Sequence, residues 1–336
     1  MKKLLRYCGL GALLAGAALY FSSCDGDDPT GPEPYDGPWK MVPCPEGPSY
    51  LKSLFFLNPD LGYAVGCSYI LKYERTEWKI DFAYKENSER YIVALEVVWF
   101  NAPDDGWVAG REYDTETKVS TALLLRYDGK EWKRFDHGTP ATSFDSLYFL
   151  SPDEGWAAGF GICHWNGTSW EYISDLSFLT DVYFNSPTDG WAVSKYSERI
   201  YHYDGSSWTR VHEGSYPSVG LYAVGFSSPD HGWAGGMDCI SGTQSNLMEY
   251  RNGKWRYFLD LPGGEGIRTN IDDIHFSAAD CGWAVGYSTF FWDGTKWREV
   301  KRPPDGYPNA VFTLSEEDAW AVGEGRYRIM HYEPEV

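Results

Sequence analysis

A short motif recurs seven times along this chain and constrains its fold more than any other feature. It consists of a glycine (alanine in the last copy), an aromatic residue that is usually tryptophan, two small residues and, in most copies, a further glycine. Successive copies begin 35 to 50 residues apart. They occupy residues 62–66, 106–110, 155–159, 190–193, 232–235, 282–286 and 319–323. Repeats of this period indicate one supersecondary unit that is built seven times and packed against its neighbours.

Each copy has the same flanks, which predict four short antiparallel strands, termed A to D in chain order. In the fourth copy an alternating run at 182–184 precedes the motif, and a strand that ends at Tyr203 follows it. The Asp204–Gly205 pair predicts a tight hairpin turn, because glycine accepts a positive φ. Trp208 begins the last strand. Seven such units predict an all-β fold, a seven-bladed β-propeller of four-stranded antiparallel blades.

The last repeat lacks a strand D, and the other end of the chain offers a replacement. After strand C at 328–332, no tryptophan-bearing strand follows. Residues 35–42 contain an Asp-Gly pair and Trp39, which is the pattern of a strand D without a repeat of its own. We therefore predict that blade 7 consists of 308–333 completed by 38–43. This pairing closes the ring and removes an open sheet edge.

The first 24 residues resemble a bacterial lipoprotein export signal. Lys2, Lys3 and Arg6 precede an apolar stretch at 7–21, which is too short to be a comfortable membrane span. Cys24 follows two serines, in the way that the acylated cysteine of a lipobox follows small residues. We expect lipid attachment at Cys24. The alternatives are cleavage of the signal without lipidation, or an uncleaved anchor.

The predicted organisation is a signal peptide at 1–23, an acidic flexible tether at 24–37 and the propeller at 38–336. We expect the protein in a bacterial cell envelope, on the outer membrane, the cell surface or the periplasmic side. The net charge is −19, and removal of 1–23 with its three positive charges lowers it to −22. Nucleic acid is excluded as a main partner, because binding it requires Lys and Arg to replace phosphate counterions. A protein or a glycan fits, bound by a monomer that touches the membrane only through its lipid.

The repeated strand and the Asp-Gly turn before the next tryptophan resemble the repeats of the photosystem II stability/assembly-factor-like family, which is related to BNR/Asp-box proteins. The resemblance covers about residues 38–333 and implies the propeller fold. It departs from the strict Asp-box, because aspartate and glycine are adjacent here. The family's assembly role implies a basic surface, which a charge of −22 does not provide. BNR-bearing sialidases imply a glycoside hydrolase or lyase instead.

In a propeller, strand A lines the central channel, and the B–C and D–A loops share one face. These loops vary in length in this chain, whereas the A–B and C–D turns are short and regular. We expect binding on the face with the variable loops. Aromatic residues there would stack on sugar rings or anchor a protein, unless they pack the loops onto the blades. These residues are Tyr50, Tyr84, Tyr91, Phe144, Phe178, Tyr216 and Tyr307.

Acidic residues at the start of strand A form a second candidate site. When the blades are aligned by the turn that follows, Asp181 and Asp273 share one position, and Glu96, Asp145 and Asp272 each precede it. Convergent carboxylates hold Ca²⁺ or act as a general acid and base. The alternative is a solvated channel mouth in which each acid faces water. No cofactor other than this optional Ca²⁺ is expected.

Cysteine and histidine form no metal motif. His164, His202 and His331 fall at the same register of strand C in three blades, so we expect them to be too far apart to share a metal. No Cys-x-x-Cys or zinc spacing is present. Cys44 and Cys67 both fall near the loop face of blade 1 and are the candidate disulfide, since an exported protein can form one.

The function that fits these features is a non-catalytic scaffold that binds a protein or glycan through the B–C/D–A loop face. No catalytic residue is assigned. A glycoside hydrolase or lyase of sialidase-like type is the first alternative. Its arginine cluster would come from Arg90, Arg111 and Arg268, which no motif aligns. Assembly of a membrane complex is the second alternative and rests on the resemblance alone.

Overall fold

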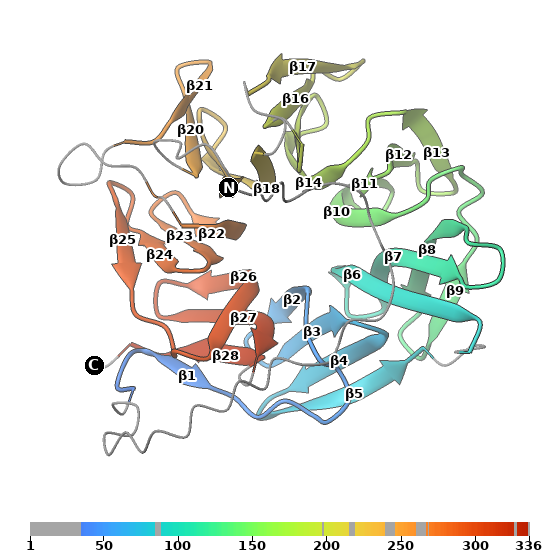
Figure 1. The fold of residues 1–336 in the computed structure, drawn as a ribbon, viewed down its shortest axis with the longest axis horizontal. Coiled ribbons are helices and arrows are strands. Elements are labelled where there is room, and N and C mark those ends of the chain that lie inside the picture. The colour runs from blue at the N-terminus through green and yellow to red at the C-terminus, as the bar shows by residue number, and fades with distance from the viewer. Residues whose placement is uncertain are drawn as a thin grey trace, which may run out of the picture. The chain divides into compact units, whose positions relative to one another are not determined.

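The structure is a computed structural model that describes residues 35–84, 89–196, 198–214, 219–238, 246–259, 267, 269–325 and 328–334. Residues Asp36–Val336 belong to one compact unit. Within the described ranges the regular elements are β-strands, which form seven four-stranded antiparallel sheets around a central axis (Figure 1). The predicted seven-bladed propeller is confirmed. No helix among the described residues is long and apolar enough to cross a membrane.

Strand A of each blade lies nearest the axis, and strands B, C and D follow outward (Figure 1). The A strands are β2 (Ser53–Asn58), β6 (Tyr91–Ala102), β10 (Phe144–Ser151), β14 (Leu179–Ser186), β18 (Val219–Ser228), β22 (Ile271–Ala278) and β26 (Gly306–Ser315). The B strands are β3 (Leu61–Gly66), β7 (Asp105–Asp114), β11 (Glu154–Gly159), β15 (Asp189–Ser194), β19 (His231–Asp238), β23 (Cys281–Gly286) and β27 (Asp318–Gly325). The C strands are β4 (Tyr69–Glu74), β8 (Ser120–Tyr127), β12 (Gly161–Trp165), β16 (Arg199–Tyr203), β20 (Leu247–Arg251), β24 (Thr289–Trp292) and β28 (Ile329–Tyr332). The D strands are β5 (Glu77–Ala83), β9 (Trp132–Phe135), β13 (Trp170–Ser174), β17 (Trp208–His212), β21 (Lys254–Tyr257), β25 (Trp297–Val300) and β1 (Trp39–Met41).

Strand β1 completes the blade that the end of the chain begins. The order of strands in that sheet is β1–β28–β27–β26. β1 pairs antiparallel with β28, so that Trp39 lies opposite Tyr332. The Val42 amide also donates to the Ile329 carbonyl at 3.0 Å. The predicted closure of the ring by the N-terminal strand is therefore confirmed.

Aromatic residues hold each blade against the next. The strand B aromatic of one blade packs on rings of the following blade: Trp156 stacks on Phe184 with ring centroids 5.1 Å apart and meets Trp208 edge-on at 5.7 Å. At the closing blade Trp283 meets Trp39 edge-on at 4.9 Å. The repeated tryptophans are core residues that join blades, and they do not form a binding box.

The first glycine of the motif leaves room for a phenylalanine ring on strand A. In six blades this glycine lies opposite a phenylalanine. A Cβ atom at Gly106 would lie 2.5 Å from the Phe100 ring, which is closer than atoms can pack. Blade 7 has neither the glycine nor the phenylalanine, because Ala319 lies opposite Thr313 there. The strand B position therefore carries a methyl group only where the opposing ring is absent.

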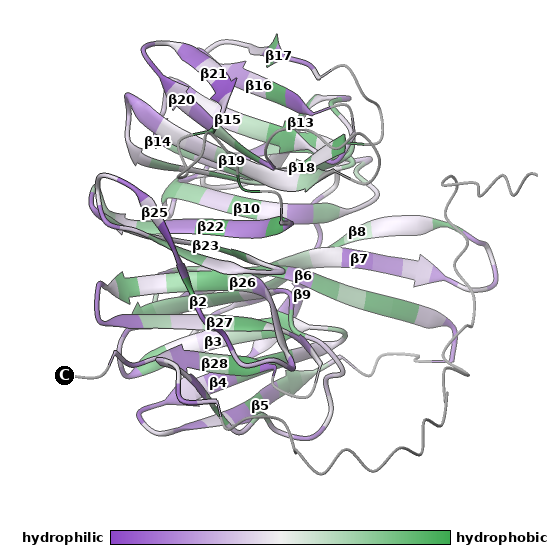
Figure 2. Ribbon diagram, turned by 60° about the vertical axis from the view of Figure 1, so that its left-hand side comes forward, coloured by the Kyte–Doolittle hydropathy of each residue, from purple (hydrophilic) through white to green (hydrophobic). Residues whose placement is uncertain are grey.

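Blade 2 extends furthest along the axis of the ring. β6 has 12 residues and β7 has 10, and together with β8 they project beyond the other strands on one side (Figure 2). This side carries the B–C and D–A loops, because the connection between β7 and β8 lies there. The projecting strands therefore mark the face on which the sequence predicts binding.

Candidate binding face

The mouth of the central channel on the B–C/D–A face is built from the start of each strand A. In six blades the register of strand A shifts near its start, which is the signature of a β-bulge. The extra residue is left out of the regular pairing with strand B. These bulged residues are Glu96, Asp145, Thr180, Tyr222, Asp272 and Asn309, and Lys52 occupies the equivalent position in blade 1.

Cations act electrostatically on three of the predicted acids at this mouth, and one of the acids forms an ion pair. Burial raises the pKa of Glu96 and of Asp145, and the nearby cations oppose that rise. Burial also raises the pKa of Asp272 to about 6, against the charge of Lys52. Arg111 Nη2 lies 3.8 Å from Glu96 Oε1. These residues interact across several blades and are called the mouth cluster: Lys52, Glu96, Arg111, Asp145, Lys195 and Asp272.

Asp181 and Asp273 share one register position, as the alignment predicts, but their carboxylates join blades to each other. Ser146 Oγ donates to Asp181 Oδ1 at 2.7 Å, and the Val224 amide donates to Oδ2 at 2.9 Å. The Val311 amide of the next blade donates to Asp273 Oδ2 at 2.8 Å. Burial raises the pKa of the two carboxyls to about 6 and about 7, respectively. Both carboxylates therefore have a structural role between blades, and the predicted ligand contact stays a prediction.

The described residues contain no group of three or more His, Cys, Asp or Glu side chains arranged to hold a metal ion. In the mouth cluster, ammonium and guanidinium groups lie among the carboxylates and compete with Ca²⁺ for their oxygens. The optional Ca²⁺ site therefore gains no geometric support. The three strand C histidines each bond to an acid of their own blade, in the pairs His164–Glu154, His202–Asp189 and His331–Asp318.

Two of the predicted binding aromatics lie in the core. Phe144 is fully buried and packs against His137 and Trp170. Tyr84 is buried, and its hydroxyl lies 3.2 Å from a Glu112 carboxylate oxygen, to which it donates. The expectation of exposed rings is wrong for these two residues, because both side chains turn inward and pack the loops onto the blades.

The other predicted aromatics differ in their surroundings. The Arg90 guanidinium lies 5.1 Å from the centroid of the Tyr91 ring. Tyr307 is 42 % exposed and remains a surface residue. Tyr216 and the predicted lipid attachment residue Cys24 lie outside the described residues.

Phe178 belongs to a cluster of rings that the sequence predicts only in part. Its ring centroid lies 4.5 Å from that of Phe160 and 4.7 Å from that of Tyr196, both edge-on. Phe160 and Tyr196 are 41 % and 45 % exposed. The Lys195 ammonium lies 5.9 Å from the Phe178 centroid, so these three rings, called the aromatic shelf, adjoin the mouth cluster. The sequence contains a signal for this cluster, because Phe160 and Tyr196 each come shortly after the repeated motif in two consecutive blades.

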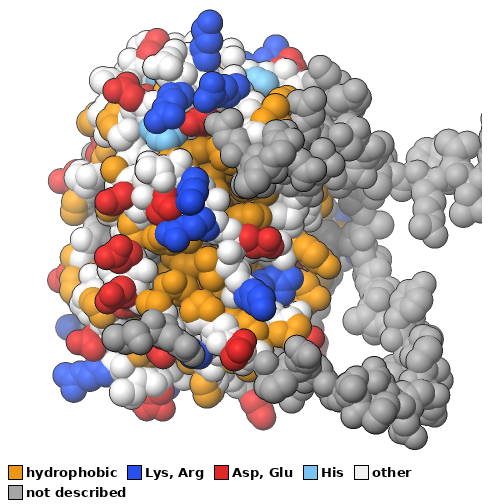
Figure 3. Space-filling model, turned by 90° about the vertical axis from the view of Figure 1, so that its left-hand side faces the viewer, with side chains coloured by type: hydrophobic (Ala, Val, Ile, Leu, Met, Phe, Trp, Pro, Cys, Tyr) orange, Lys and Arg blue, Asp and Glu red, His pale blue; other side chains and the backbone are white. Residues whose placement is uncertain are grey.

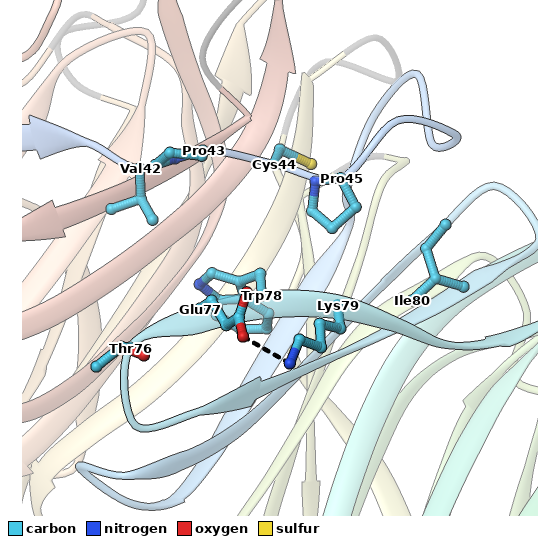
Figure 4. A pocket seen from close by; sticks show the side chains of 9 residues that line it. All are labelled: Val42, Pro43, Cys44, Pro45, Thr76, Glu77, Trp78, Lys79 and Ile80. Atoms are coloured by element: carbon cyan, nitrogen blue, oxygen red, sulfur yellow. Dashed lines mark ion pairs between the residues drawn. The ribbon is translucent and has the colours of Figure 1, made fainter.

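The predicted disulfide between Cys44 and Cys67 is not formed, and both thiols are free. Cys67 Sγ lies 3.3 Å from the Ser49 hydroxyl. Cys44 lies in a groove of about 410 Å³ between the segment that follows β1 and strand β5, where Glu77 and Lys79 form an ion pair (Figure 4). Burial raises the pKa of the Cys44 thiol. The groove follows the junction between blade 7 and blade 1, so it belongs to the closure of the ring.

No protein-family model matches the chain, and no curated protein matches it. Solved structures do match. YCF48 bound to D1 peptide aligns with a TM-score of 0.64 and 16 % identity, over 89 % of this chain and 97 % of that one. The WD40 propeller domain of Doa1 aligns with a TM-score of 0.65 and 11 % identity, over 89 % of this chain and 98 % of that one. Virginiamycin B lyase from Staphylococcus aureus aligns with a TM-score of 0.66 and 9 % identity, over 87 % of this chain and 97 % of that one.

These likenesses show the fold. At such low identity they transfer neither partner nor activity to this chain, because one fold carries many functions. The residues of the mouth cluster and the aromatic shelf must therefore carry the functional argument.

Proposed function

We propose that this protein is an exported, lipid-anchored, non-catalytic scaffold whose B–C/D–A face binds a segment of a protein partner. The observation that carries the proposal is the mouth cluster with its adjoining aromatic shelf. Rings that are half exposed on a rigid frame act as anchors in protein interfaces, and adjacent charges of both signs select the partner. Export and anchoring are supported by the sequence of residues 1–24.

The mouth cluster contains three cations and three acids, so the charge that disfavours a strongly anionic partner is that of the whole chain. The chain carries a net charge of −19, which repels anions at long range. A non-catalytic role is supported by Asp181 and Asp273, whose oxygens accept backbone amides of neighbouring blades. YCF48 has been solved with a bound peptide, which supports a peptide-binding role for a propeller of this shape.

Site-specific photo-crosslinking in producing cells tests the proposal. A benzophenone amino acid replaces Tyr196 of the aromatic shelf in the full chain, and a matched variant carries it at Ser206, in the C–D turn of the same blade. We expect a discrete protein adduct from position 196, weakened by Phe160→Ala because that change removes a neighbouring exposed ring of the aromatic shelf, and none from position 206. Equal adducts from both positions, or no adduct from position 196, would contradict binding through this face.

A sialidase-like hydrolase is the second candidate, because burial raises the pKa of Glu96 and Asp145 in the direction that a general acid requires. Its arginine cluster has less support. Arg90 is bonded to a neighbouring aspartate, Arg111 is paired with Glu96, and Arg268 lies outside the described residues. Release of a fluorescent aglycone from sialosides by the full chain, abolished in Asp145→Asn, would favour this candidate over the scaffold.

A further inference from the structure

A second concave site lies on the same face, at the junction of blades 6 and 7. It is a pocket of about 510 Å³ between the B–C loop of blade 6, strand β25 and the start of β26. Tyr287 and Tyr307 line it and are 63 % and 42 % exposed. Their ring centroids lie 6.1 Å apart, with 37° between the ring planes. On the side of the ring that carries β25, hydrophobic side chains gather between groups of Lys and Arg (Figure 3).

Arg302 holds the two rings in place. Its guanidinium lies 5.5 Å from the Tyr287 centroid and 4.8 Å from the Tyr307 centroid. Nε and Nη2 donate to the Tyr287 carbonyl at 2.9 and 2.7 Å, and Nη1 donates to the Gly306 carbonyl at 2.6 Å. Backbone carbonyls therefore occupy the donors that would otherwise recognise a carboxylate or phosphate. The arginine instead fixes the orientation of the rings, which lowers the entropy lost when a ligand binds.

Polar groups surround the rings. The residues that line the pocket include Ser288, Glu299 and Lys301, whose side chains carry a hydroxyl, a carboxylate and an ammonium group. The two tyrosines add phenol hydroxyls at the ring edges. The pocket therefore combines flat apolar surfaces with hydrogen-bonding groups at their margins.

We propose that this site, called the tyrosine pocket, binds a neutral oligosaccharide. A pyranose ring has an apolar face that stacks on an aromatic ring and a rim of hydroxyls that need hydrogen-bond partners, and the pocket supplies both. A proline-rich peptide would match the rings but leave the polar margin without partners. The lining carries the Glu299 carboxylate as well as the Lys301 ammonium, and backbone carbonyls occupy donors of Arg302, so the pocket has no arginine fork to select an anionic sugar. The tyrosine pocket is distinct from the aromatic shelf, so this inference goes beyond the proposed function.

Isothermal titration calorimetry of the purified full chain in detergent tests the inference, with cellohexaose, xylohexaose, maltohexaose and N-acetylchitohexaose as probes. We expect at least one of them to bind. We expect Tyr287→Ala and Tyr307→Ala each to weaken that binding by about tenfold or more. The matched control is Ile173→Ala on strand β13, which removes a side chain that is 43 % exposed and belongs to neither site, and it should leave the affinity unchanged. Unchanged melting temperatures verify that all three variants are folded.

The inference is overturned if none of the four oligosaccharides binds, or if the binding survives both tyrosine substitutions. It is also overturned if a proline decapeptide binds in place of the sugars and is lost in the same variants. None of these results affects a crosslink from position 196. Failure of the tyrosine pocket and failure of the proposed scaffold are therefore distinguishable.

Discussion

Asp273 both joins two blades and makes the ring sensitive to pH. Its carboxylate accepts the Val311 amide, and Asp181 accepts the Val224 amide at the same register two blades earlier. Ser53 and Ser146 accept weaker bonds from the next blade, each at 3.3 Å. One position of strand A thus provides a set of hydrogen bonds between blades.

Asp273 is expected to reduce stability as pH rises. Burial raises the pKa of this carboxyl to about 7 in the folded protein, whereas an unfolded chain holds it near ~3.9. The folded state therefore binds the proton more tightly, and stability is lost as pH rises from about 4 to about 7. The Asp273→Asn side chain does not titrate, so this variant avoids that loss. We expect the free energy of unfolding of Asp273→Asn minus that of the parent to increase by about 1–3 kcal/mol from about pH 5 to about pH 8.

Urea denaturation of both proteins at the two pH values measures this change. His275, whose pKa burial lowers to about 4, acts in the opposite sense. It is present in both proteins, so the comparison cancels it. A stability difference that does not vary with pH would show that Asp273 keeps one ionisation state throughout.

Gly106 should not tolerate a methyl group. Gly106→Ala places a Cβ against the Phe100 ring, and such overpacking destabilises a core by about 1–3 kcal/mol. The matched change is Ala319→Gly in blade 7, where no ring faces the position. It should cost only the backbone entropy of glycine, about 0.5–1 kcal/mol. Urea midpoints compare the two variants, and equal losses would remove the steric explanation.

The sequence predicts the register of these residues but not their surroundings. Asp181 and Asp273 align correctly, yet alignment cannot show whether a carboxylate faces water or a neighbouring amide. Phe144 was placed on the loop face for the same reason, although its ring turns inward toward Trp170. The cations Lys52 and Lys195 were missed, because they meet the acids only when separate blades come together.

At the scale of elements, strand β1 decides whether the ring is closed. The strands and the closure were predictable, because the repeat, the Asp-Gly turns and the unpaired strand D are local signals. In the C–D turn of blade 4, the Asp204 carboxylate accepts hydrogen bonds from the amides of Ser206 and Ser207, as expected of the tight turn that the Asp-Gly pair predicts. The bulges in strand A were not predictable, since they depend on how each sheet twists against its neighbours.

Trp39 should account for most of the stability that β1 contributes. It is fully buried, and its ring lies 5.4 Å from that of Tyr332. Trp39→Ala should destabilise the protein by about 3–5 kcal/mol, the usual loss for a buried tryptophan. Lys40→Ala, which changes the exposed neighbour on the same strand, serves as the control and should be close to neutral. Equal effects in urea denaturation would mean that β1 does not seal the ring.

At the scale of the whole molecule, the proposed anchor ties an acidic propeller to a membrane. The net charge of −19 makes adsorption to an anionic lipid surface unfavourable, so attachment would depend on the lipid. The sequence alone supports this part of the proposal, since Cys24 lies outside the described residues.

Cys24→Ala should release the protein from the membrane fraction. In cells fed an alkynyl fatty acid, we expect the parent protein to be labelled and Cys24→Ala to carry no label, because the acylated side chain is missing. Cys8→Ala, within the predicted signal peptide, should keep the label and serves as the control. Labelling that persists in Cys24→Ala would contradict lipid attachment at this residue.

The closing strand also sets an order of events during synthesis. β1 leaves the ribosome before every other strand of the propeller, whereas its partner β28 leaves last. Trp39 therefore has no partner strand until the entire repeat array has been translated. A chain interrupted before Ile329 keeps that tryptophan and the outer edge of the last blade uncovered. The ring can therefore close only in a chain that includes β28.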